Sequence, residues 1–155
     1  MVRWPYFVLA GGVLLLDRLS KYLVTQLLEP GDSVVLIGFL SLTRVHNPGG
    51  AFGLLAGGGK LFIPISAAVS LWLGLGLCRG WFSSRWARLG GALLLAGAVG
   101  NLIDRLAYGY VIDFVNLGWF PVFNLADAGV VVGAALLAVG TLIGPLRPQA
   151  GEEID

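Results

Sequence analysis

Apolar residues fall into four long runs along this chain, and polar stretches separate them. The runs span about residues 6–28, 61–78, 89–106 and 123–144. Each is close to the roughly 20 residues that a helix needs to cross the hydrocarbon core of a membrane. The pattern therefore predicts four transmembrane helices. The clearest is at 61–78, where the run contains no charged residue.

The first run differs from the others because its second half carries Asp17, Arg18 and Lys21. Asp17 and Lys21 stand one helical turn apart with the acid first, which is the favourable order for an ion pair. Ionisable residues inside a membrane are costly and usually functional. Two interpretations stay open: the pair satisfies only itself, or it supports a functional site.

The polar stretch after the first run predicts short strands and a glycine-rich loop. Residues 29–32 end the helix, and 33–45 are rich in β-branched and apolar residues with partial alternation. Glycine then recurs through residues 49–59. Glycine allows backbone conformations closed to other residues and a close approach to a ligand. A glycine run alone does not identify a site, since most such runs are turns.

Positive charges and small residues predict the arrangement of the helices. Three arginines gather in the short connection at 79–88, as expected for a cytoplasmic loop. Four crossings then place both termini in the cytoplasm, and residues 31–59 and 108–120 on the outer side. Small residues at four-residue spacing in the third and fourth runs predict close helix packing; they are Ala92, Ala96, Gly100, Gly129 and Gly133.

Composition agrees with a membrane protein rather than a soluble domain. The chain is 57% hydrophobic and 12% charged, with a mean hydropathy of +0.84. Its net charge of +1 gives no indication of a nucleic-acid partner. The single cysteine, Cys78, and the single histidine, His46, do not provide a disulfide framework or a Cys/His metal site. We therefore expect no metal and no cofactor.

The stretch between the third and fourth runs supplies candidate chemistry, because it places aspartates beside lipid. Asp113 lies in the outer connection, and Asp127 lies one turn into the fourth run from the same surface, so the two can meet. Two carboxylates at a partly dehydrated site share one proton, which provides a base and an acid. Such a pair can hydrolyse an amide. Asp104 could pair locally with Arg105 or brace the site, and we favour bracing.

Three other interpretations compete with a hydrolase. A small proton-coupled transporter subunit also places carboxylates among small-residue helices. Its acids would be expected near the bilayer midplane or along a path, whereas here they gather at one surface. A purely structural membrane scaffold would carry buried acids at a cost and without a use. The plainest interpretation is a membrane-surface hairpin whose loop is polar for ordinary reasons.

Five stretches in order carry a resemblance to a known family. They are DRLSK at 17–21, NPGGAFG at 47–53, GNLIDR at 100–105, GYVIDF at 109–114 and FNLADAGVVVG at 123–133. With them the chain resembles, over nearly its whole length, lipoprotein signal peptidase (signal peptidase II), the membrane aspartic peptidase family of bacteria. Two departures are Arg18, where glutamine is common, and Gly50, where alanine is.

The resemblance implies an all-α membrane protein with four transmembrane helices and a small extracytoplasmic β cradle, forming one domain over residues 1–155. It implies an endopeptidase of the cytoplasmic (inner) membrane that removes signal peptides from prolipoproteins, cleaving before the diacylglyceryl-modified cysteine. Its partners would be these substrates and membrane lipids, and it would act as a monomer. The aromatic segment 108–120 would lie over the site as a lid.

The resemblance also assigns the site. The catalytic pair falls on Asp113 and Asp127. The supporting residues fall on Asp17, Lys21, Asn47, Gly49, Asn101, Asp104, Arg105, Asn124 and Ala126.

Overall fold

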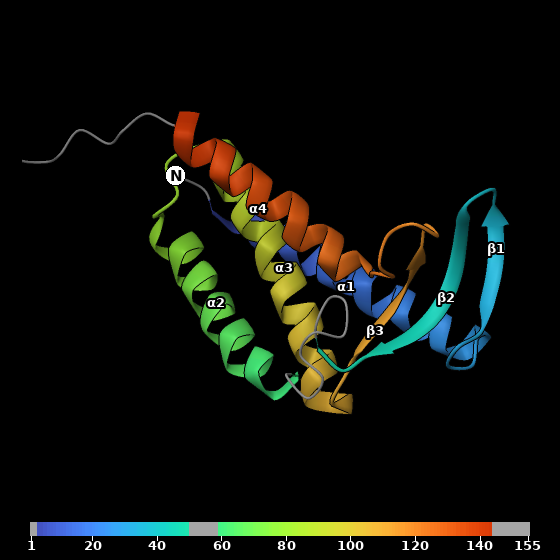
Figure 1. The fold of residues 1–155 in the computed structure, drawn as a ribbon. Helices are drawn as coiled ribbons and strands as arrows, with labels where there is room; N and C mark the ends of the chain where they lie inside the picture. The colour runs from blue at the N-terminus through green and yellow to red at the C-terminus, as the bar shows by residue number, and fades with distance from the viewer. Residues whose placement is uncertain (1–2, 50–58, 144–155) are drawn as a thin grey trace, which may run out of the picture.

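Four helices and a three-stranded sheet make up the computed structural model, which describes residues 3–49 and 59–143. The elements are α1 (Trp4–Leu27), β1 (Ser33–Ile37), β2 (Leu40–Asn47), α2 (Gly59–Arg79), α3 (Arg85–Tyr108), β3 (Val111–Asn116) and α4 (Leu125–Ile143). The helices lie side by side, and the sheet extends from one end of them (Figure 1). Most of the glycine-rich loop, at 50–58, and the tail at 144–155 fall outside the described residues.

The four helices confirm the four apolar runs. By length and composition, α2, α3 and α4 can each cross a membrane. Helix α1 has 24 residues, which is also long enough, but it contains Asp17, Arg18 and Lys21. Asp17 and Lys21 are fully buried, so these charges face the other helices and not the outside. The charged side chains of Asp17 and Lys21 can therefore lie inside the bundle while the outer surface of α1 stays apolar.

Helices α3 and α4 touch through their backbones. A Cβ atom on Gly133 of α4 would stand 2.6 Å from the backbone nitrogen of Leu94, and one on Gly97 of α3 would collide with the carbonyl oxygen of Ala126. Any larger side chain at these two glycines would push the helices apart. The prediction of close packing at Gly133 is thus confirmed, whereas Gly97 was not predicted.

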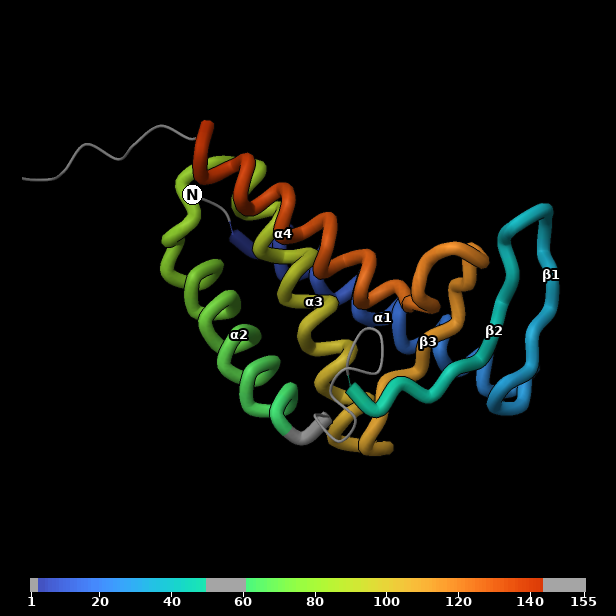
Figure 2. The backbone as a smooth tube through the Cα atoms, viewed as in Figure 1, coloured from blue at the N-terminus to red at the C-terminus, as the bar shows by residue number. Residues whose placement is uncertain are grey.

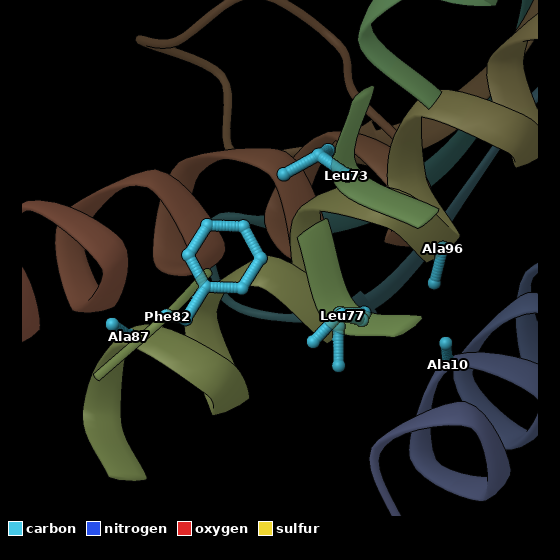
Figure 3. Close-up of a cluster of buried hydrophobic side chains, with 7 residues drawn as sticks. Ala10, Leu73, Leu77, Phe82, Ala87 and Ala96 are labelled. Atoms are coloured by element: carbon cyan, nitrogen blue, oxygen red, sulfur yellow. The ribbon is translucent and has the colours of Figure 1, made fainter. Parts of the chain in front are cut away.

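The predicted small face of α3 does not pack on α4 along its whole length. Ala92 and Ala96 belong instead to a buried apolar cluster with residues of α1 and α2, which is drawn in Figure 3. The other members of the cluster are Ala10, Leu73, Leu77, Phe82 and Ala87. Helix α3 therefore uses one small-residue face toward α1 and α2 and another toward α4.

The sheet is antiparallel in the order β1-β2-β3. Strands β1 and β2 confirm the strands predicted at 33–45. Strand β3 was not predicted as a strand, and the expected lid at 108–120 is wrong for residues 111–116, which form this strand. Val111–Asn116 pairs with β2, and its first four residues are buried. Figure 2 shows the chain running from β3 through a short loop into α4. The sheet thereby carries Asp113 to the start of α4.

Candidate active site

The start of α4 fixes one candidate aspartate. The Asp127 backbone N–H donates to Oδ1 of Asn124 at 2.8 Å, and the Asn124 N–H donates to Oδ2 of Asp127 at 3.2 Å. This reciprocal pair is the arrangement of a capping box, in which each side chain satisfies a backbone N–H that the helix leaves open. The Asp127 carboxylate is therefore held at the positive end of the helix dipole.

The second candidate aspartate comes from β3 and is more deeply buried, with Asp113 only 2% exposed. Its Oδ2 accepts a hydrogen bond from Nδ2 of Asn47 at 2.9 Å, and its Oδ1 accepts one from Nδ2 of Asn124 at 2.7 Å. The Gly49 N–H donates to Oδ1 of Asn47 at 3.0 Å. This contact uses a glycine with a φ of 116°. The bond from Gly49 keeps Asn47 oriented as a donor toward Asp113.

Two asparagine side chains connect the carboxylates. Nδ2 of Asn101 on α3 donates to Oδ1 of Asp127 at 2.7 Å. Nδ2 of Asn124 donates to Oδ1 of Asn101 at 3.1 Å as well as to Asp113. The structure thus joins Asp113 and Asp127 in one hydrogen-bond network. Burial raises the pKa of Asp113 to about 6, and the charge of Asp127 adds to this effect, while the amide bonds oppose it.

A buried ion cluster contacts the side chain of Asn101. Nζ of Lys21 lies 2.9 Å from Oδ2 of Asp17, 2.8 Å from Oδ2 of Asp104 and 3.1 Å from Oδ1 of Asn101. The predicted pair of Asp17 and Lys21 is therefore present, but it does not satisfy only itself. Lys21 and Asn124 both donate to the same oxygen of Asn101. The Asn101 amide can then present only its N–H groups to Asp127.

The two acids of this cluster tie separate elements together. Oδ1 of Asp17 on α1 accepts a hydrogen bond from the N–H of Ala126 at 3.0 Å. Oδ2 of Asp104 on α3 accepts one from the N–H of Ile112 at 3.2 Å, and its Oδ1 binds Arg18. Asp104 bonds to groups outside its own helix, as expected for bracing. Each acid holds a backbone position directly beside a candidate catalytic aspartate.

Arg105 is connected to the carboxylates by charge and not by a hydrogen bond. Its guanidinium carbon lies 5.2 Å from the ring centroid of Phe62 on α2. The charges of Asp127 and Asp113 both act on it. Its buried Nε has no hydrogen-bond partner within residues 3–49 and 59–143. The arginine therefore adds positive potential to the site.

Sequence reasoning missed the part that Arg18 takes in the network. Its side chain binds Asp104 and donates to the carbonyl oxygen of Gly100 at 3.3 Å. The spacing of Arg18 and Lys21, three residues apart on one helix face, was the available signal. His46 stacks on Tyr110 with ring centroids 3.9 Å apart.

The site offers few side chains that could bind a metal ion. In the described part of the chain, no group of three or more His, Cys, Asp or Glu side chains could hold a metal ion. All four oxygens of Asp113 and Asp127 instead accept hydrogen bonds from amide or backbone N–H groups. The arrangement is suited to storing and moving protons.

Fold and site together define a helical membrane protein with a pair of aspartates at one end of its bundle. A family model described as signal peptidase (SPase) II matches residues 9–143. The chain belongs to this family, whose members are aspartic peptidases of the membrane, and it is a multi-pass membrane protein.

Individual relatives agree with this assignment. The chain is 47% identical over 151 residues to a lipoprotein signal peptidase of Moorella thermoacetica, covering 96% of this chain and 97% of the relative. It is 46% identical over 154 residues to one of Rhodococcus jostii, covering 95% and 76%. A bacterial membrane enzyme solved by the in meso method at 2.3 Å resolution superposes with a TM-score of 0.82 at 31% identity, covering 89% of this chain and 87% of that one.

Proposed function

We propose that this chain is the aspartic endopeptidase that removes signal peptides from prolipoproteins, cleaving before the diacylglyceryl-modified cysteine. One observation carries the chemical part of the proposal: Asp113 and Asp127 come from different elements, yet asparagine amides join them in one network. The relatives named lipoprotein signal peptidase support the choice of substrate. A transporter is less well supported, because the carboxylates gather at one end of the bundle.

The two aspartates would take different roles. Asp127 is only partly buried and sits at the start of α4 near Arg105, so we assign it the role of the base. Asp113 is buried and has a raised pKa, so it is the better proton donor. Ionised Asp127 would take a proton from a water that attacks the scissile carbonyl carbon. Protonated Asp113 would hydrogen-bond the carbonyl oxygen and then protonate the leaving nitrogen as the carbon–nitrogen bond breaks.

The dependence of kcat/KM on pH tests these roles. Activity requires protonated Asp113, whose pKa in the free protein is about 6. Above this pH, kcat/KM will fall tenfold per pH unit, which gives the alkaline limb of the profile. The Asn47 amide stabilises the ionised carboxylate. Removing it in Asn47→Leu will raise the pKa of Asp113 and move the alkaline limb to higher pH.

Asn116→Leu is the matched control for this experiment. Asn116 ends the same strand as Asp113, but its amide donates to Thr43 at 3.0 Å and not to a carboxylate. The alkaline limb should therefore stay in place in Asn116→Leu. A limb that moves down in Asn47→Leu, or that moves equally in both variants, would contradict the assigned role of Asp113.

We also propose that the sheet end of the bundle faces outward and that both termini are cytoplasmic. Single cysteines in a Cys78→Ala background can test this. Ser83 and Trp119 are both exposed and lie at opposite ends of the bundle. In sealed right-side-out vesicles, Trp119→Cys should react with an impermeant maleimide, and Ser83→Cys should react only after detergent opens the vesicles. The reverse pattern would invert the proposed topology.

The choice of substrate needs a direct test. Purified enzyme would be given one prolipoprotein with and without its diacylglyceryl group, and an ordinary secreted preprotein. The lipid anchors the cysteine at the membrane, each buried methylene contributing about 0.8 kcal/mol, and so places the preceding peptide bond at the site. We expect cleavage of the lipidated form alone. Equal cleavage of all three would indicate a general peptidase, and cleavage of none would favour the transporter.

A further inference from the structure

A cavity of about 210 Å³ lies between the ends of α1 and α3 and strand β3. Its lining residues are Arg18, Lys21, Tyr22, Thr25, Tyr108 and Ile112. Neither candidate catalytic aspartate lines it. Ile112 does, and because successive strand residues point to opposite faces, its neighbour Asp113 points away from the cavity. The cavity is therefore separate from the paired carboxylates.

Arg18 is the charged group that a ligand in this cavity would meet. Lys21 is fully buried, and its ammonium group is already bonded to three partners. Arg18 is 26% exposed and uses only one terminal nitrogen, for Asp104 and for the carbonyl oxygen of Gly100. Its Nε and its other terminal nitrogen have no hydrogen-bond partner among the described residues. One side of the guanidinium group is thus available to the cavity.

The remaining polar groups of the lining are hydroxyls. Tyr22 and Tyr108 are both exposed, and Thr25 lies one turn beyond Tyr22 on the same side of α1. No carboxylate lines the cavity within the described residues. The Thr25 hydroxyl already donates to the carbonyl oxygen of Tyr22 at 2.7 Å, so the lining offers the two tyrosine O–H groups as donors beside an open arginine fork. Arginine in this setting matches the geometry of a phosphate group, which it can bind through two parallel hydrogen bonds.

The position of the cavity points to a lipid as the source of the phosphate. Tyr108 is the last residue of α3, and Thr25 lies two residues before the end of α1. Tyrosine and arginine are typical of the membrane–water interface. One turn from Arg18 toward the middle of α1, Leu15 is 67% exposed. A molecule with its phosphate at Arg18 would find apolar surface for its acyl chains directly beside it.

We propose that this cavity binds the phosphate group of a membrane phospholipid. The bound group would hold Arg18 in place against Asp104, which in turn bonds the backbone N–H of Ile112 beside Asp113. A structural lipid would thereby brace the strand that carries one of the candidate aspartates. The proposal stands on its own, whichever substrate the paired carboxylates act on.

Thermal unfolding of the full chain in a neutral detergent tests the proposal. The probes are dioleoylphosphatidylglycerol, dioleoylglycerol and glycerol 3-phosphate. We expect the phosphatidylglycerol alone to raise the Tm, in proportion to its concentration in the micelles. Arg18→Gln should weaken its apparent affinity at least tenfold, and Tyr108→Phe should weaken it by a smaller factor. Arg85→Gln, an exposed arginine at the other end of the bundle, should leave the affinity unchanged.

Three results would overturn the proposal. An equal rise in Tm with dioleoylglycerol would show that acyl chains suffice. An equal rise with glycerol 3-phosphate would show a site for water-soluble anions and not for a lipid. An unchanged affinity in both Arg18→Gln and Tyr108→Phe would place lipid binding elsewhere. Tyr108→Phe does not touch the bond between Arg18 and Asp104, so if Arg18→Gln fails to fold, an unchanged affinity in Tyr108→Phe alone overturns the proposal.

Discussion

Replacing Asp113 or Asp127 with asparagine will lower kcat/KM for prolipoprotein cleavage by roughly 100- to 10,000-fold, the usual contribution of a positioned acid or base. Asparagine keeps the size of aspartate and most of its hydrogen bonds. It cannot exchange a proton at the site. The helix start can still form, because an amide oxygen at position 127 can accept from the N–H of Asn124 as the carboxylate does. Activity should therefore collapse without loss of the fold.

Asp32→Asn provides the matched control. Asp32 is exposed and, among the residues that the structure describes, bonds only to backbone groups of its own turn and of Arg44. The same chemical change there should leave turnover within about twofold, since surface substitutions have small effects. Helix content by circular dichroism and the Tm should be compared across all three variants. If either dyad variant keeps more than a tenth of the wild-type kcat/KM, the proposed pair is wrong.

Among the substitutions proposed for the site, Lys21→Met will lower the free energy of unfolding the most. It removes the only ammonium group among the described residues that contacts Asp17 and Asp104, and both acids are fully buried. Breaking a buried ion pair from one side costs about 3–5 kcal/mol, because the remaining charge stays uncompensated. Asn101 also loses a donor, so its amide can turn and stop donating to Asp127. Both stability and activity should fall.

A double variant separates lost charge balance from lost packing. Asp17→Asn combined with Lys21→Met removes one charge of each sign, so it should be more stable than Lys21→Met alone. The free energies of unfolding of the wild type, Asp17→Asn, Lys21→Met and the double variant form a cycle that gives the coupling energy of the pair. A loss below about 1 kcal/mol in Lys21→Met would mean that solvent reaches the cluster, contrary to its complete burial.

Helices were predictable because each apolar run is a local signal. Strand β3 was not, because VIDFV at 111–115 is almost continuously apolar and shows no alternation. Its partner strand lies more than 60 residues earlier, with Val45 opposite Asp113. The start of α4 did carry a local signal. An asparagine followed three residues later by an acid, as in Asn124 and Asp127, is a pattern of helix starts.

The connections of the ion cluster depend on how the helices are rotated, which spacing within one helix does not reveal. The i, i+4 relation of Asp17 and Lys21 was visible in the sequence. Their contacts with Asn101 and Ala126, on two other helices, were not. That Asn101 and Asn124 belong to the same site was inferred from the family resemblance. Their function as a link between two carboxylates appears only when the elements are assembled.

The backbone contact between α3 and α4 has a consequence for motion. Glycines at this contact bring the two backbones together with no side chain between them, so the contact is tight. Asn101 and Asp127 are thus mounted on a single rigid frame. We expect this frame to stay fixed through a catalytic cycle. Opening a path for a bulky acylated peptide would then fall to elements outside this frame, such as α2 and the β1–β2 hairpin.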